Sequence, residues 1–259
     1  MLQVTDVAFA YGDQAVLHGV SFAVPRGQIV GLLGPNGSGK TTLLRIMAGT
    51  LAPARGRVQI DGADVTAMAR RDVARRIAVV PQETHTTFDF TVEDIVLMGR
   101  YPHLGAFELE GPDDRALARD ALAATGTLAL AERMFGTLSG GEKQRVVIAG
   151  ALAQASEILL LDEPTASLDL GYQLDIASLL KALNRDRGTT MVVCTHDLGF
   201  AASLCSTLVL IRDGRVVAHG ATADVLTAQN VRALYGVDAD IVFNLRAQHL
   251  TVVPIARAQ

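Results

Sequence analysis

Residues 34–41 read GPNGSGKT, and they lie between the apolar run QIVGLL, residues 28–33, and the segment TTLLRIMAG, residues 41–49. The apolar run predicts a buried strand, and the segment after the glycines reads as a helix. Glycines at 34, 37 and 39 let the backbone curl so that its N–H groups converge, and the helix directs its positive end at the same point. Strand, glycine-rich loop and helix in this order predict a phosphate-binding loop.

Within this loop each polar side chain has an expected partner on ATP. Lys40 is predicted to bridge the β- and γ-phosphates, and the Thr41 hydroxyl is predicted to ligate Mg²⁺. The residues expected to contact the nucleotide here are Gly34, Pro35, Asn36, Gly37, Ser38, Gly39, Lys40, Thr41 and Thr42.

An acidic pair follows a second apolar run. Asp162 and Glu163 come directly after ILLL at residues 158–161, which predicts that they lie at the carboxyl end of a buried strand. Ligands of open α/β sheets bind at such ends. We expect Asp162 to hold Mg²⁺ through water, and Glu163 to orient and deprotonate the attacking water. Two adjacent acids alone are typical of a surface loop, but the strand and the phosphate-binding loop favour the catalytic interpretation.

Residues 138–142 read LSGGE and open a predicted helix. Ser139, Gly140 and Gly141 would offer a hydroxyl and free N–H groups to an anion. The same residues would also serve as an ordinary helix cap with a glycine-rich lead-in. The pattern alone leaves both interpretations open.

Along the chain the glycine-rich loop comes first, LSGGE second and the acidic pair third. These three motifs in that order resemble the ATP-binding subunit of ATP-binding-cassette (ABC) transporters over nearly the whole chain. The resemblance implies that LSGGE contacts the γ-phosphate bound by the opposite subunit, so that two copies facing head to tail enclose two ATP molecules. It implies catalytic roles for Gln82, which senses Mg²⁺ and the γ-phosphate near the membrane partner, and for His196, which hydrogen-bonds the γ-phosphate. It also implies that Asp169 lies at the dimer interface and that Tyr11 stacks on adenine, although a tyrosine in a turn is also common without a ligand.

The alternation of buried strands with helices predicts an α/β fold. The resemblance implies a P-loop ATPase core with a mostly parallel sheet, an N-terminal antiparallel β-subdomain and a helical subdomain that carries the LSGGE motif. We expect one ATPase domain over residues 1–259. Within it, residues 1–82 and 156–236 form the nucleotide-binding core, residues 83–155 the helical subdomain, and residues 237–259 a tail with a terminal hairpin.

Residues 88–103 read FDFTVEDIVLMGRYPH, a segment that resembles the ATPases of importers for iron–siderophores, haem and cobalamin. Alternatively, the final tripeptide merely ends a helix, because proline is common there. The resemblance implies a ferric siderophore as cargo, with haem and cobalamin open, since the cargo is recognised by other subunits. An exporter ATPase and a soluble ABC ATPase are the alternatives. The soluble class usually carries two cassettes or a long coiled-coil insertion, and this sequence shows neither.

The charge and the cysteines limit the partners. A net charge of −4 argues against a nucleic-acid partner, because phosphate backbones require basic patches. Cys194 and Cys205 lack metal-ligand spacing, so we expect reduced core thiols in a cytoplasmic protein.

No signal peptide is visible, and the apolar runs are far shorter than the roughly 18 residues of a membrane span. The resemblance implies a peripheral subunit on the cytoplasmic face of the inner membrane, with two permease subunits and, indirectly, a substrate-binding protein.

Overall fold

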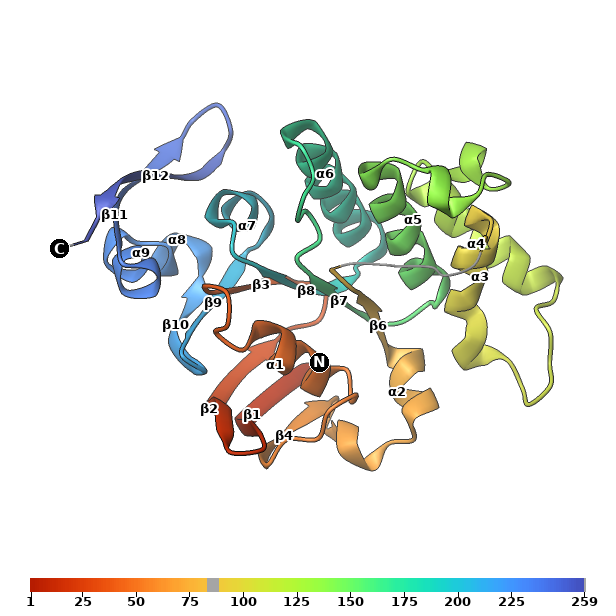
Figure 1. The fold of residues 1–259 in the computed structure, drawn as a ribbon, viewed down its shortest axis with the longest axis horizontal. Helices are drawn as coiled ribbons and strands as arrows, with labels where there is room; N and C mark the ends of the chain where they lie inside the picture. The colour runs from red at the N-terminus through yellow and green to blue at the C-terminus, as the bar shows by residue number, and fades with distance from the viewer. Residues whose placement is uncertain (83–88, 259) are drawn as a thin grey trace.

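A six-stranded sheet lies at the centre of the computed structural model, which describes residues 1–82 and 89–258 (Figure 1). Its strand order is β10-β9-β3-β8-β7-β6. Neighbouring strands from β9 to β6 run parallel, whereas β10 pairs antiparallel with β9, which confirms the mostly parallel sheet. The strands are β3 (Ile29–Leu33), β6 (Ile77–Val80), β7 (Ile158–Asp162), β8 (Thr190–Thr195), β9 (Thr207–Arg212) and β10 (Arg215–Ala221).

An antiparallel sheet of order β2-β1-β4-β5 is formed by the N-terminal part of the chain, as the resemblance implied. Helix α1 (Lys40–Met47) lies between the two sheets, and its apolar side chains share one buried cluster with both. The helix that follows the glycine-rich loop is therefore held from two sides. The strands of this sheet are β1 (Leu2–Tyr11), β2 (Gln14–Val24), β4 (Arg55–Ile60) and β5 (Ala63–Asp64), and η1 (Val65–Ala67) and α2 (Arg70–Arg76) lead from it to β6.

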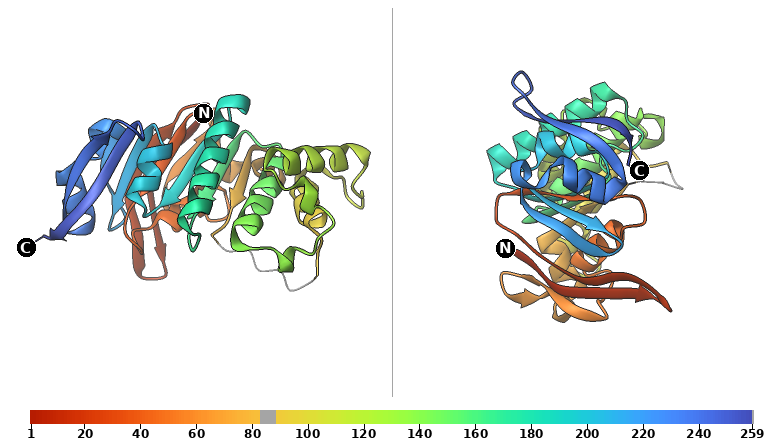
Figure 2. Two further views of the ribbon diagram at one scale, coloured as in Figure 1. Left: turned by 90° about the horizontal axis from the view of Figure 1, so that it is seen from above. Right: turned by 90° about the vertical axis from the view of Figure 1, so that its left-hand side faces the viewer.

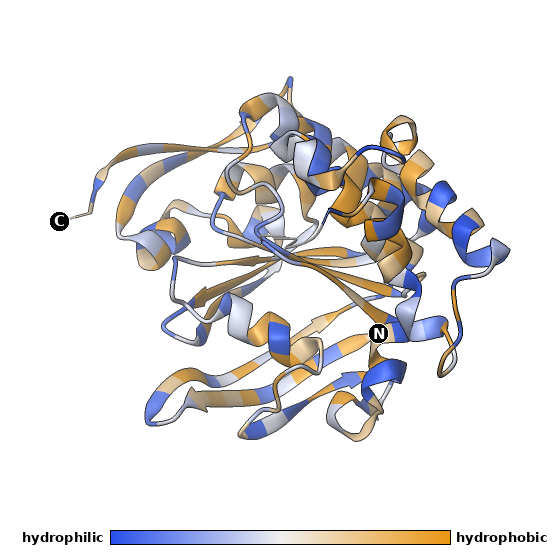
Figure 3. Ribbon diagram, turned by 45° about the vertical axis from the view of Figure 1, so that its right-hand side comes forward, coloured by the Kyte–Doolittle hydropathy of each residue, from blue (hydrophilic) through white to orange (hydrophobic). Residues whose placement is uncertain are grey.

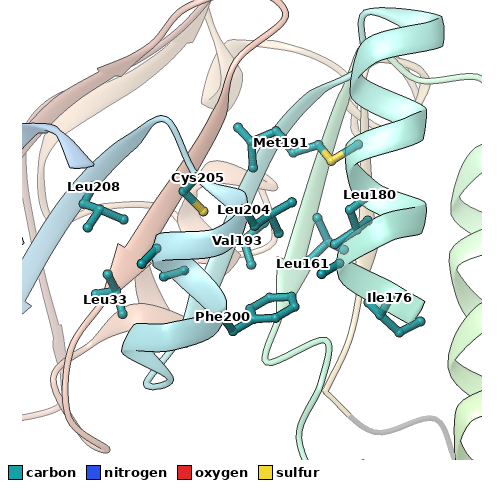
Figure 4. Close-up of a cluster of buried hydrophobic side chains, with 14 of the residues drawn as sticks. Leu33, Leu161, Ile176, Leu180, Met191, Val193, Phe200, Leu204, Cys205 and Leu208 are labelled. Carbon is teal, nitrogen blue, oxygen red and sulfur yellow. The ribbon is translucent and has the colours of Figure 1, made fainter. Parts of the chain in front are cut away.

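The central strands are buried on both faces, as parallel strands usually are. In β8, Val192 and Cys194 join the cluster around α1, whereas Met191 and Val193 join a cluster on the opposite face. Figure 4 shows side chains of this second cluster, which come from the central strands and from α6 (Leu170–Arg187) and α7 (Leu198–Leu204). Figure 3 shows the predominantly hydrophobic colouring of these strands.

The apolar stripe predicted within α6 faces this second cluster. Ile176, Leu180 and Leu183 are buried in it, and Leu179 packs against it. Burying one such side chain contributes roughly 1.5–3 kcal/mol. The stripe is thus core-facing, as its spacing predicted.

Three helices form a separate buried cluster at one end of the molecule, opposite the C-terminal hairpin (Figure 2). They are α3 (Val92–Leu97), α4 (Pro112–Ala124) and α5 (Gly140–Ala153), joined by the short helices η2 (Met98–His103), η3 (Leu128–Leu130) and η4 (Phe135–Thr137). Three predicted parts of the chain extend beyond the described residues. The predicted helical subdomain and the importer-like segment both begin within residues 83–88, and the predicted tail ends at Gln259.

The chain ends in a hairpin, as predicted, which is longer than its apolar pattern indicated. Strands β11 (Val237–Asn244) and β12 (His249–Arg257) pair antiparallel and follow α8 (Thr222–Val225) and α9 (Ala228–Tyr235). Strand β12 packs on α7, and α9 packs on β11. The hairpin is therefore joined to the same helices that cover the central sheet.

Both cysteines are buried and free. Burial raises the pKa of the Cys205 thiol to about 12 and that of the Cys194 thiol well above its ordinary value. Both side chains therefore behave as small apolar core residues. Across residues 1–82 and 89–258, no helix has both the length and the apolar character needed to traverse a bilayer.

Candidate nucleotide-binding site

The segments that follow β3, β6, β7 and β8 meet at a cavity of about 400 Å³. All four strands end at the same edge of the sheet because they run parallel. This is the edge at which open α/β sheets bind ligands. The lining comprises Val16, Asn36, Gly37, Gly39, Lys40, Thr41, Thr42, Gln82, Glu163 and His196.

The glycine-rich loop has the backbone that its sequence predicts. Gly39, the residue before α1, has a φ of 99°, and a Cβ there would lie 2.7 Å from the Leu17 side chain. Lys40 follows and is 6% exposed; its Nζ donates to the carbonyl oxygens of Gly34 (2.8 Å) and Pro35 (3.2 Å). The loop thus curls around its own lysine, at the positive end of a helix.

Glu163 faces two cationic or hydrogen-bonding side chains. Its Oε1 lies 3.8 Å from Nζ of Lys40, and its Oε2 lies 2.9 Å from Nδ1 of His196. Glu163 has a φ of 48°, a left-handed conformation that costs a non-glycine residue roughly 1–3 kcal/mol. Its own N–H donates to the carbonyl of Cys194 on the neighbouring strand, at 2.9 Å. These contacts therefore restrict the position of the Glu163 carboxylate at the edge of the cavity.

Asp162 is buried, lies outside the cavity lining and is hydrogen-bonded to the lining residue Thr41. Burial raises the pKa of Asp162, and a hydrogen bond from the Thr41 hydroxyl partly offsets this shift. Among the described residues, Asp162 Oδ1 and Ser38 Oγ are buried without a hydrogen-bond partner. An unpartnered buried polar atom costs roughly 1–3 kcal/mol. A hard cation beside the carboxylate, with phosphate oxygens near the loop, would satisfy both atoms, so these residues fit Mg²⁺ and a nucleotide.

The LSGGE loop lies outside the lining of this cavity. Ser139 caps α5, and Glu142 accepts hydrogen bonds from the Ser139 N–H (2.8 Å) and hydroxyl (2.9 Å). Gly141 is buried, and a Cβ there would lie 2.1 Å from the ring of Tyr172. Both interpretations of this sequence are therefore compatible with the geometry, since a capped helix start is also where an anion binds.

Five further predicted residues also lie outside the cavity lining: Gly34, Pro35 and Ser38 of the glycine-rich loop, Tyr11 and Asp169. Tyr11 is 46% exposed at the end of β1, with its ring 4.8 Å from that of Phe9 in an edge-on contact. Asp169 caps α6 and accepts a hydrogen bond from the Tyr172 N–H at 3.0 Å.

One lining residue, Val16 of β2, was not singled out from the sequence. A valine in a strand carries no signal that separates a cavity wall from the core.

Comparison with known proteins identifies the relatives of this arrangement. Residues 17–166 match the model of the ABC transporter family. The ferric enterobactin transport ATP-binding protein of Escherichia coli (strain K12) is 39% identical over 97% of this chain and 93% of its own length. The hemin import ATP-binding protein of Bordetella pertussis (strain Tohama I) is 42% identical over 93% of this chain and 94% of its own length.

Solved structures agree in fold. A chain from an ABC transporter in an inward-facing conformation superposes with a TM-score of 0.87 at 31% identity, covering 98% of this chain and 96% of that one. A bacterial ABC transporter cassette solved as a dimer superposes with a TM-score of 0.75 at 30% identity, covering 86% of this chain and 99% of that one.

Proposed function

This chain belongs to the ABC transporter family, and we propose that it is the ATP-hydrolysing subunit that powers an importer. The observation that carries the proposal is the grouping of Lys40, Glu163 and His196 at one cavity. The three residues follow three different strands, and a loop that binds phosphate forms the adjoining wall. A base, a cation and a hydrogen-bonding imidazole at a phosphate site are the groups that phosphoryl transfer to water requires.

In the proposed mechanism, the backbone N–H groups of residues 37–42 and the Lys40 ammonium bind the phosphates of ATP. The Glu163 carboxylate orients the attacking water and accepts its proton. The His196 ring, fixed by its contact with Glu163, hydrogen-bonds the γ-phosphate. Mg²⁺, when bound, would neutralise phosphate charge, with Thr41 and Gln82 as ligands and Asp162 acting through water.

In this proposal the LSGGE loop acts on the ATP that is bound by a second copy of the chain. Residues 139–141 would face the γ-phosphate held by the opposite subunit, and Asp169 would lie at the interface between them. The dimeric relative supports such an assembly, and a twofold arrangement of this kind is self-limiting. The helical subdomain, residues 83–155, would hold this loop against the nucleotide-binding core of the opposite subunit. That core would comprise residues 1–82 and 156–236, and residues 237–259 would form the tail.

The cargo we propose is a ferric siderophore, with haem and cobalamin as the close options. The names of the two curated relatives support import of iron chelates or haem. The working assembly would contain two ATPase subunits, two permease subunits and a substrate-binding protein that this chain does not touch directly. The ATPase would sit peripherally on the cytoplasmic face of the inner membrane.

Uptake of labelled cargo tests this proposal. Cells whose only copy carries Glu163→Gln are given labelled ferric siderophore, haem and cobalamin in parallel, and Glu132→Gln, at an exposed glutamate, serves as the matched control. Loss of one cargo in the first variant alone supports import and identifies the substrate. Normal entry of all three contradicts the importer assignment and points to an exporter or to another cargo.

A further inference from the structure

The main chain of His196 is held by a residue that the mechanism above does not use. The Tyr235 hydroxyl donates a hydrogen bond to the His196 carbonyl oxygen, with a donor–acceptor distance of 3.2 Å. Burial raises the pKa of Tyr235 well above its ordinary value, so the hydroxyl keeps the proton that it donates. His196 is thus fixed at two points, at its ring by Glu163 and at its carbonyl by Tyr235.

Tyr235 is the last residue of α9, and the C-terminal hairpin begins two residues later. Its side chain packs against the main core cluster, together with Ile241 of β11 and Val252 of β12. A second, largely apolar cavity of about 380 Å³ lies between these elements, and His196 lines both this cavity and the nucleotide cavity. His196 therefore separates the cavity beside the C-terminal hairpin from the nucleotide cavity.

The C-terminal hairpin also contacts the segment that follows His196. Strand β12 packs on α7, which begins two residues after His196. Asp197 caps this helix by accepting from the Phe200 N–H at 2.9 Å, and its own N–H donates to the Thr195 hydroxyl at 3.1 Å. A displacement of the hairpin would act on His196 both through α7 and through Tyr235.

We propose that Tyr235 is a positioning residue for His196, through which the C-terminal hairpin sets the rate of ATP hydrolysis. The proposal rests on the proposed role of His196 at the γ-phosphate. Without the hydroxyl, the peptide after His196 loses its restraint and the imidazole drifts from its place beside Glu163. Small misplacements of a catalytic group are costly because the reaction requires an aligned geometry.

The test replaces Tyr235 by phenylalanine in the full chain and measures steady-state ATPase kinetics and thermal unfolding. Tyr101→Phe is the matched control, because Tyr101 is 64% exposed and lies in η2, which packs against α2, α3 and α5. We expect Tyr235→Phe to lower kcat about fivefold, which corresponds to about 1 kcal/mol, with KM for ATP changed less than about twofold. Tyr101→Phe should behave as wild type. A fall in unfolding temperature with kcat unchanged overturns the proposal, because it would give the hydroxyl a structural role only.

A double-mutant cycle tests the route through His196. In a His196→Ala background, followed under single-turnover conditions, Tyr235→Phe should cause no further loss. An equal loss in both backgrounds means that Tyr235 acts elsewhere and overturns the proposal.

A spectroscopic measurement is independent of turnover. The imidazole proton resonance of His196, assigned by its absence in His196→Ala, should move in Tyr235→Phe and stay in place in Tyr101→Phe. A wild-type chain without ATPase activity would refute the proposed function, whereas an unmoved resonance would refute the positioning role.

Discussion

The carboxylate of Glu163 is shared between two partners, with Oε2 lying 2.9 Å from Nδ1 of His196 and Oε1 lying 3.8 Å from Nζ of Lys40. The three residues come from three segments of the chain, so this contact exists only in the folded sheet. Glu163 is 9% exposed and has left-handed backbone angles, and both features restrict its movement. In the proposed mechanism, a carboxylate that is already fixed in this way needs no reorganisation when it accepts the proton.

The first prediction concerns Glu163→Gln in the purified protein. Glutamine keeps the size and the hydrogen-bonding capacity of the side chain but does not accept a proton, so hydrolysis should fall about 10²- to 10⁴-fold. ATP binding should persist, and two chains should stay associated around ATP because the γ-phosphate is not removed. ATPase assays and light scattering with and without ATP measure both effects, with Glu132→Gln as the control. Wild-type turnover in Glu163→Gln would remove this residue from the role of base.

The second prediction concerns Lys40→Met. The lysine donates to two loop carbonyls and lies within ion-pair distance of Glu163, so its ammonium is placed to meet phosphate oxygens. Hydrogen bonds to charged groups are worth about 2 kcal/mol, so the dissociation constant for ATP should rise about thirtyfold. Titration with a fluorescent ATP analogue measures this change, and Lys181→Met on the exposed face of α6 is the control. An unchanged affinity in Lys40→Met would contradict the phosphate-binding role.

The elements that the sequence predicted best are those specified locally. The run at residues 28–49 contains its own strand, turn and helix signals, and the structure follows them within one or two residues. The helix cap at Ser139 is likewise determined locally, because Glu142, three residues later, completes the capping box. Such signals depend on backbone preferences that act within one turn.

The contacts that the sequence did not predict join residues far apart in the chain. Tyr235 contacts the His196 carbonyl across 39 positions, and no local pattern distinguishes it from another core tyrosine. The close approach of Tyr172 to Gly141 depends on how α6 packs beside α5. Both follow from tertiary packing, which a pattern of residue types does not specify.

The third prediction follows from that packing. An alanine at Gly141 would place its Cβ 2.1 Å from the Tyr172 ring, so the ring or the start of α5 must move. Overpacking of this kind costs about 1–3 kcal/mol, which urea unfolding detects. ATP binding by a single chain should persist, whereas ATP-dependent dimer formation should be lost because the Ser139–Gly141 loop is displaced. Adding Tyr172→Ala to Gly141→Ala should restore the dimer, and a double variant that fails to dimerise would argue against a steric cause.

The fourth prediction concerns the buried ion pair between Arg100 and Asp114. The side chains are 8% and 16% exposed, Nε of Arg100 lies 2.9 Å from Oδ1 of Asp114, and the guanidinium also donates to the Ala153 carbonyl. The pair thereby ties the start of α4 to the end of α5. Asp114→Asn would leave a buried cation without its counter-ion and should lower the free energy of unfolding at pH 7 by about 3 kcal/mol.

The pH dependence of this loss follows from the sign of the pKa shift. The hydrogen bond from Arg100 holds the pKa of Asp114 below its usual value of 3.8, so the pair stabilises the folded state above that pH. This contribution disappears as the pH falls through the lowered folded-state pKa. Urea unfolding should therefore show a gap between wild type and Asp114→Asn that narrows at acidic pH. Asp113→Asn, at the exposed neighbouring position, should show a much smaller gap at pH 7. A gap for Asp114→Asn that stays constant with pH would mean that the loss arises from packing and not from the charge.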